Sequence, residues 1–175
     1  AVITIETEPG GIVWFGTVRG VSRDDPTLAA HGKVPFVNDT SENSGGGLPS
    51  GSIDAIHRAR NGEVWLGGPG GLARWSGNGF VNVSNTRNAL FKVVRGMAES
   101  ADGTLWFATD RGLIRYDGTQ FSNLGEGVGQ RLECNGTLTI VPNGTIWFGA
   151  KDGIWRFDAA TKPTTQQNFT IVTGV

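Results

Sequence analysis

One fifteen-residue segment occurs four times in this chain of 175 residues. The clearest copies are DGTLWFATDRGLIRY at 102–116 and NGTIWFGAKDGIWRF at 143–157. The others are NGEVWLGGPGGLARW at 61–75 and the more divergent GGIVWFGTVRGVSRD at 10–24. Three positions are shared by all copies: Trp14, Trp65, Trp106 and Trp147; Gly20, Gly71, Gly112 and Gly153; Arg23, Arg74, Arg115 and Arg156. A period of about 40 residues indicates an array of equivalent supersecondary units.

Each copy and its flanking residues predict four short strands joined by tight turns. In the second copy the strands are 53–59, 63–68, 72–75 and 80–84, and the second of them is apolar enough to be buried on both faces. Four strands in this order form an antiparallel meander, which is one blade of a β-propeller. We therefore predict an all-β fold with four four-stranded antiparallel blades in one domain, 1–175. The approximate blade limits are 1–52, 53–92, 93–130 and 131–175.

Asn-Gly or Asp-Gly pairs separate the first two predicted strands of three copies. They are Asn61-Gly62, Asp102-Gly103 and Asn143-Gly144. These dipeptides favour a two-residue type I′ hairpin, in which both central residues have positive φ. We therefore expect type I′ turns at these three places.

The composition excludes several classes of function. Fifteen basic and sixteen acidic residues leave a net charge of −1 with no basic run, so the sequence lacks the phosphate-neutralising patch of a nucleic-acid-binding protein. No apolar stretch approaches the roughly 18 residues that span a bilayer. Cys134 is the only cysteine, which excludes an internal disulfide and a cysteine metal cluster.

The predicted blade order bears on assembly. The chain begins with the innermost strand of blade one and ends with the outermost strand of blade four, so no blade combines both chain ends. The exposed faces of the end blades would then need cover. We expect a homodimer in which two chains complete an eight-bladed ring. The alternatives are a self-closed ring of four blades and a piece of a longer propeller, which would also explain the absence of an initiator Met. The interface residues expected in a dimer are Val2, Ile3, Ile5, Phe169, Ile171 and Val172.

The repeat resembles the two-component regulator propeller repeat. The resemblance rests on a turn followed by G-x-[LIV]-W-[FIL]-[GA]-[TA], then G-[LI] and an Arg-aromatic pair, and on the connection Gly47-Leu48-Pro49-Ser50. It covers essentially the whole chain. It implies a sensor-type propeller, a periplasmic or extracellular location and a small carbohydrate-type ligand. No kinase or receiver region accompanies the repeats, and the family motif identifies no ligand-contacting residue.

The repeated residues are interpreted first as scaffold. A tryptophan at one place in every blade is expected to fill the gap between neighbouring blades. Each arginine is expected to stack on an aromatic ring or to bridge backbone carbonyls. A ring of four arginines that binds an anion is the alternative.

Residues that differ between copies are the candidates for ligand binding. First strands line the channel of a propeller, and the polar residues predicted there are Glu6, His57, Arg58, Arg95 and Glu99. The sequence contains no G-x-S-x-G, no metal-ligand spacing and no cofactor motif, so we predict a non-catalytic module without metal or cofactor. This module is either a sensor-type ligand binder or a scaffold that assembles with itself. The alternative is a propeller lyase or hydrolase with His57 as the base.

The first copy contains about ten extra residues between Arg23 and Ile53. This insertion is polar and rich in Gly, Ser and Asn. Insertions in repeat proteins fall in loops, often on the binding face. We expect a surface loop, with a binding loop as the alternative. Asp24 and Asp25 are adjacent, so on an extended segment their side chains would point in opposite directions and make a poor acid–base pair.

Overall fold

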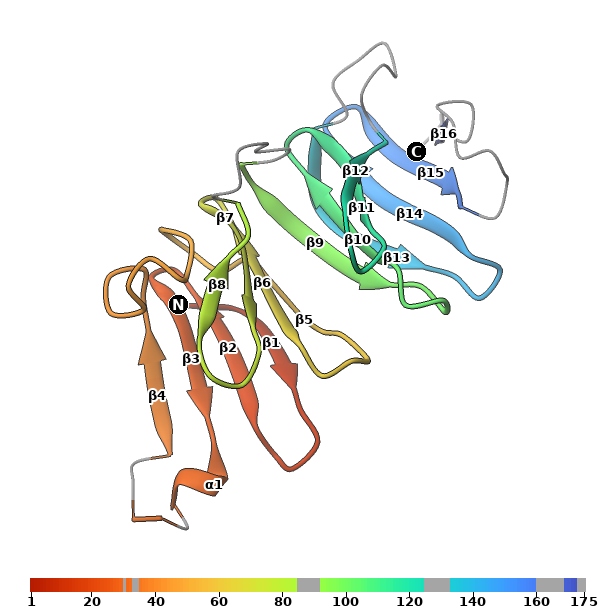
Figure 1. The fold of residues 1–175 in the computed structure, drawn as a ribbon. Coiled ribbons are helices and arrows are strands. Elements are labelled where there is room, and N and C mark those ends of the chain that lie inside the picture. The colour runs from red at the N-terminus through yellow and green to blue at the C-terminus, as the bar shows by residue number, and fades with distance from the viewer. Residues whose placement is uncertain (30, 33–34, 85–91, 125–132, 160–168, 173–175) are drawn as a thin grey trace. The chain divides into compact units, whose positions relative to one another are not determined.

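The structure is a computed structural model that describes residues 1–29, 31–32, 35–84, 92–124, 133–159 and 169–172. These residues form four four-stranded sheets in which consecutive strands pair antiparallel (Figure 1). Blade one contains β1 (Val2–Thr7), β2 (Val13–Thr17), β3 (Gly20–Asp24) and β4 (Phe36–Asp39). Blade two contains β5 (Ala55–Arg58), β6 (Val64–Gly68), β7 (Gly71–Trp75) and β8 (Phe80–Asn82).

The remaining two sheets have the same order. Blade three contains β9 (Val94–Glu99), β10 (Leu105–Thr109), β11 (Gly112–Tyr116) and β12 (Phe121–Asn123). Blade four contains β13 (Cys134–Ile140), β14 (Thr145–Ala150), β15 (Gly153–Asp158) and β16 (Phe169–Val172). The predicted all-β fold with four antiparallel blades is confirmed. Strand β6 is buried along its whole length, as its apolar sequence predicts.

The chain divides into two compact units, Ala1–Ala89 and Leu90–Val175. The first unit contains blades one and two, and the second contains blades three and four. Each unit has a hydrophobic core formed between its two blades. Each unit is compact by itself, so the single domain over 1–175 stays a prediction.

The core of each unit is formed by the strands of two successive blades. In the first unit Trp14 of β2 packs with Leu66 of β6, and both are fully buried. In the second unit Trp106 of β10 packs with Phe148 of β14 and with Phe157 of β15. Burial of one large apolar side chain contributes roughly 1.5–3 kcal/mol. Each pair of blades therefore shares one core, to which the first of its two blades contributes its repeated tryptophan, Trp14 or Trp106.

The prediction of type I′ turns is wrong. Gly62 has a φ of 90°, but no described residue other than glycine has a positive φ, so Asn61 cannot occupy the first position of a type I′ turn. The Gly62 N–H donates to the Ala59 carbonyl at 2.9 Å, and the Ala59 N–H donates to the Glu63 carbonyl at 2.9 Å. This is a three-residue hairpin loop with a left-handed glycine at its end. The same hydrogen-bond pair occurs at Gly103 and at Gly144.

The side chain before the glycine explains why Asn or Asp occurs there. The Asn61 Oδ1 atom accepts a hydrogen bond of 3.0 Å from the Glu63 N–H. Asp102 accepts from Thr104, and Asn143 accepts from Thr145, at the same distance. An Asn or Asp side chain that bonds the backbone two residues ahead stabilises a turn without positive φ at its own position.

The insertion in blade one contains both exposed and buried residues. A short helix, α1 (Pro26–Ala29), follows β3, and the Thr27 N–H donates to Asp25 Oδ1 at 3.1 Å. After β4 the chain turns toward Leu48, which is fully buried in the core of the first unit. No helix in the described part of the chain has the length and apolar character to cross a bilayer.

Candidate functional site

Strand register places each repeated tryptophan between two partners. On one side, every tryptophan lies directly opposite the repeated arginine of the third strand. On the other side lies a first-strand residue that differs between blades: Glu6, His57, Ala98 or Thr139. Directly opposite side chains share one face of a sheet. We call the face with this row the tryptophan face of a blade, and the other face its reverse face.

Blades one and two meet through the tryptophan face of blade one. The Trp14 ring centroid lies 5.8 Å from that of Trp75 and 6.3 Å from that of Phe80, on the reverse face of blade two. The Arg23 guanidinium lies 5.2 Å from the Trp14 centroid and 4.7 Å from the Trp75 centroid. The cation therefore stacks with two indoles, and each such contact contributes about 0.5–2 kcal/mol.

An acidic residue adds polar contacts to the same junction. The Trp14 Nε1–H donates to Glu8 Oε1 at 2.6 Å, and Arg58 Nε lies 3.7 Å from Glu8 Oε2. Ser100 accepts from Trp106 Nε1 at 2.8 Å in the same way. Our sequence reasoning missed Glu8. The available signal was an acceptor side chain six residues before the tryptophan in the first and third copies.

Blades three and four pack in the same order. Trp106 is 3% exposed, and its ring centroid lies 5.5 Å from that of Phe157, on the reverse face of blade four. Phe157 also packs against Phe169 of β16, with centroids 4.6 Å apart. In both units, therefore, the tryptophan face of one blade packs on the reverse face of the next blade.

The residues predicted to form an interface have different environments. Val2, Ile3 and Ile5 are 45–59% exposed. Phe169 and Ile171 are half-buried and pack against the core of the second unit, since they share the face that contains Phe157. Val172 lies opposite Ile154, on the tryptophan face of blade four.

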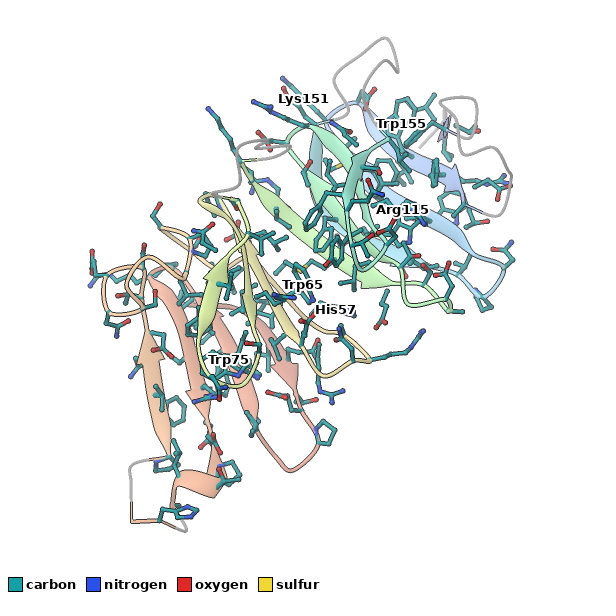
Figure 2. The ribbon with its side chains drawn as sticks, in the orientation of Figure 1. His57, Trp65, Trp75, Arg115, Lys151 and Trp155 are labelled. Atoms are coloured by element: carbon teal, nitrogen blue, oxygen red, sulfur yellow. The ribbon has the colours of Figure 1, made fainter. Side chains whose placement is uncertain are left out.

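The five candidate ligand-binding residues are divided between the units. Glu6, His57 and Arg58 belong to the first unit and are half-buried, whereas Arg95 and Glu99 belong to the second. Figure 2 shows His57 beside Trp65, its partner on the neighbouring strand. Arg58 is held by the ion pair with Glu8. The grouping of all five around one ligand stays a prediction.

Burial alters the acidity of two groups. It raises the pKa of the Cys134 thiol to about 12, so the thiol stays protonated at neutral pH and is a poor nucleophile. Burial also raises the pKa of Asp39, while the positive charge of Arg23 acts in the opposite direction. Among the described residues, no three or more His, Cys, Asp or Glu side chains form a group that could hold a metal ion.

Asp117 caps the turn between β11 and β12, and this predicts a pH-dependent contribution to stability. Its Oδ1 atom accepts hydrogen bonds from the backbone N–H groups of Gln120 and Thr119, both at 3.0 Å, and from the Thr119 hydroxyl. These bonds lower the pKa of Asp117 to about 2. Because the pKa is lower in the folded state, the contribution is present above about pH 4 and is lost as the pH falls toward about 2.

We therefore expect the stability advantage of the wild-type chain over Asp117→Asn to be greatest above pH 4 and to shrink toward pH 2. Urea denaturation of both chains at several pH values measures it. A difference that stays constant between pH 6 and pH 2 would contradict the prediction.

The sequence matches no family model and no curated protein. Among solved structures it is similar to propeller domains. The extracellular domain of the hybrid two-component system BT3049 from B. thetaiotaomicron superposes with a TM-score of 0.72 at 20% identity, covering 99% of this chain and 22% of that one. The extracellular domain of BT4673 from the same organism superposes with a TM-score of 0.76 at 18% identity, with the same coverage.

An enzyme of the same architecture is also similar. Virginiamycin B lyase from Staphylococcus aureus superposes with a TM-score of 0.64 at 15% identity, covering 97% of this chain and 55% of the lyase. The chain thus spans about a fifth of the length of the two sensor domains and about half that of the lyase. At these identities the comparisons show the fold, which is that of a β-propeller built from blades of this type.

Proposed function

We propose that this chain is a non-catalytic β-propeller module of the sensor type found in extracytoplasmic regulators, and that it binds a small carbohydrate-type ligand. The observation that supports this most strongly is the fold similarity over 99% of the chain to two extracellular domains of signalling systems. The repeat motif in the sequence independently resembles the two-component regulator propeller repeat. A periplasmic or extracellular location is part of the same proposal.

The residues proposed to contact the ligand are those that the repeat does not use for packing. Trp14 and Arg23 are engaged between blades one and two, and Trp106 is engaged between blades three and four. Glu6 and His57 occupy the variable first-strand position of the same rows. A carboxylate and an imidazole can both hydrogen-bond the hydroxyl groups of a sugar.

Titration with two oligosaccharides tests this function. Maltotetraose is the neutral probe and tetragalacturonate the acidic one, and NMR shift changes of the backbone amides are the readout. We expect one of them to shift amides of β1 and β5, and His57→Ala to weaken that binding at least about tenfold, which equals about 1.4 kcal/mol. Arg19→Ala, at an exposed residue of the β2–β3 turn, is the control. Each probe is added to at least about a 10-fold molar excess, up to the roughly millimolar concentrations at which weak ligands bind. If neither probe shifts any backbone amide, the proposal is contradicted.

A lyase is the second candidate, and the similarity to virginiamycin B lyase favours it. His57 would then be the base, since it is the histidine on a first strand. Incubation of the wild-type chain with virginiamycin B, followed by mass spectrometry of the substrate, distinguishes the two functions. Substrate conversion that is lost in His57→Ala would favour the lyase, and the absence of conversion would favour the binding module.

A further inference from the structure

The tryptophan face of blade four is less covered than those of the other blades. Trp14, Trp65 and Trp106 are at most 3% exposed, whereas Trp147 is only half-buried. Arg156, directly opposite Trp147, is exposed. This face therefore has the tryptophan and arginine of a blade junction but not the cover that Trp14 receives from blade two.

The reverse face of blade one is apolar and also exposed. Ile5 is 59% exposed and Phe36 is 47% exposed. Phe15, which lies opposite Ile5, stacks on Phe36 with ring centroids 5.8 Å apart. Contiguous apolar side chains at a surface mark an interaction site. In the two junctions that the structure describes, a reverse face is the surface that receives a tryptophan face.

Strand register identifies which residue of blade one corresponds to Trp75. Trp75 follows the repeated arginine of blade two and lies opposite Phe80. In blade one the same position is Asp24, which lies opposite Phe36. An acidic residue therefore replaces the aromatic one at this place, and in blade one only, since blades three and four have Tyr116 and Phe157.

This replacement suits the arginine of blade four. Between blades one and two, the Arg23 guanidinium lies 4.7 Å from the Trp75 ring. If blade one covers blade four with the same geometry, Arg156 meets the Asp24 carboxylate at that place. Among the described residues, neither side chain has a hydrogen-bond or ion-pair partner. The charges are opposite, and an arginine–carboxylate pair is among the strongest polar contacts at an interface.

We propose that the tryptophan face of blade four docks on the reverse face of blade one from a second copy of this chain, with Arg156 of one copy paired to Asp24 of the other. Two copies form two such junctions and close a ring with twice the four blades of one chain. That total lies within the roughly four to eight blades that are typical of propellers, and a third copy would exceed it.

The geometry of the junction within the first unit favours a second copy over closure of one chain on itself. Trp14 lies on the second strand of blade one, yet it contacts Phe80 on the fourth strand of blade two at 6.3 Å. A four-bladed ring turns about 90° from blade to blade and an eight-bladed ring about 45°. Neighbouring strands are about 4.8 Å apart, so a steep turn would separate the outer strands beyond contact. The observed contact fits the shallower turn.

Charge reversal at the two positions tests this interface in the full chain. The wild-type chain is expected at twice its mass of 18.5 kDa in size-exclusion chromatography with light scattering. Arg156→Glu and Asp24→Arg each place like charges at both junctions, and each is expected to raise the dimer Kd at least about 100-fold. Lys151→Glu reverses an exposed charge at the turn before β15 (Figure 2) and is expected to leave the dimer unchanged.

An equimolar mixture of the two variants distinguishes a second copy from self-closure. In the mixed dimer, the two substituted side chains face each other at one junction as an ion pair of reversed polarity, and the original pair remains at the other. The dimer mass should therefore return. Circular dichroism melts confirm that each variant is folded.

Two outcomes would overturn the proposal. The first is a monomeric wild-type chain at about 100 µM, a concentration far above the Kd of a stable dimer. The second is a loss of stability in each single variant that is restored only when Arg156→Glu and Asp24→Arg are combined in one chain. That result would indicate that one chain closes on itself.

Discussion

Trp14→Ala is expected to lower the free energy of unfolding by about 3–5 kcal/mol, the range for removing a large aromatic side chain from a core. Trp14 is fully buried, and its ring contacts Trp75 and Phe80 of the next blade. Its loss also leaves Arg23 with one aromatic partner in place of two. It further removes the hydrogen bond that the indole N–H donates to Glu8. One substitution therefore removes apolar, cation–π and hydrogen-bonding contacts from the same junction.

Trp147→Ala is the matched control because Trp147 occupies the same place in blade four but is only half-buried. Both substitutions are made in the Arg156→Glu chain, which we expect to be monomeric, so assembly does not contribute to the measured stability. Urea denaturation followed by circular dichroism is the measurement. The loss from Trp147→Ala should be clearly smaller. Equal losses would show that the position of the tryptophan in the repeat, and not its cover by the next blade, determines its contribution.

Gly68→Ala is expected to be the most disruptive of the glycine substitutions in blade two. A Cβ atom at Gly68 would lie 1.9 Å from the Ser52 carbonyl oxygen, a backbone atom of the segment that enters β5. Because a backbone atom cannot rotate away, β6 or the blade connection must shift. Overpacking usually costs about 1–3 kcal/mol and occasionally more, and we expect about 3 kcal/mol or more here.

Gly79→Ala provides the comparison. Gly79 lies in the turn before β8, and its φ is outside the left-handed region. Apart from Gly79 itself and its two chain neighbours, no described residue has an atom within 4 Å of a Cβ built there. This substitution is expected to leave the stability unchanged or to raise it by about 0.4–1 kcal/mol, because alanine restricts the unfolded chain. Thermal melts of both variants test the pair. If the Gly68→Ala and Gly79→Ala chains have the same melting temperature, the close approach of β6 to Ser52 is refuted.

The hairpin turns show where sequence reasoning reached its limit. The Asn-Gly and Asp-Gly pairs correctly located the turns between first and second strands. The same dipeptides are compatible with a two-residue loop and with a three-residue loop, and the choice depends on which backbone groups pair across the hairpin. The hydrogen bonds of Ala59 to Gly62 and Glu63 decide it, and they are not visible in the residue types.

The candidate site was predictable in part for a similar reason. The copies differ at Glu6 and His57, so the variability of this position is visible in the aligned repeats themselves. Glu8 was not identified, because its importance depends on the distance of its carboxylate from Trp14 and Arg58 in three dimensions. The contact with Trp14 has a local signal, an acceptor six residues before the tryptophan in the first and third copies. The contact with Arg58 joins residues far apart in the chain, and no local pattern encodes it.

The sequence alone determined the number of blades and the place of the repeated segment in each, since a fixed period and alternating apolar residues follow from strand geometry. Only the tertiary structure decided what the repeated tryptophan and arginine contact. Alternation assigns side chains to two faces of a sheet but not to the neighbour that each face meets. Packing through space made that assignment, and it showed that Trp75, which the repeat aligns with Asp24, is the residue that contacts Trp14 and Arg23 of the preceding blade.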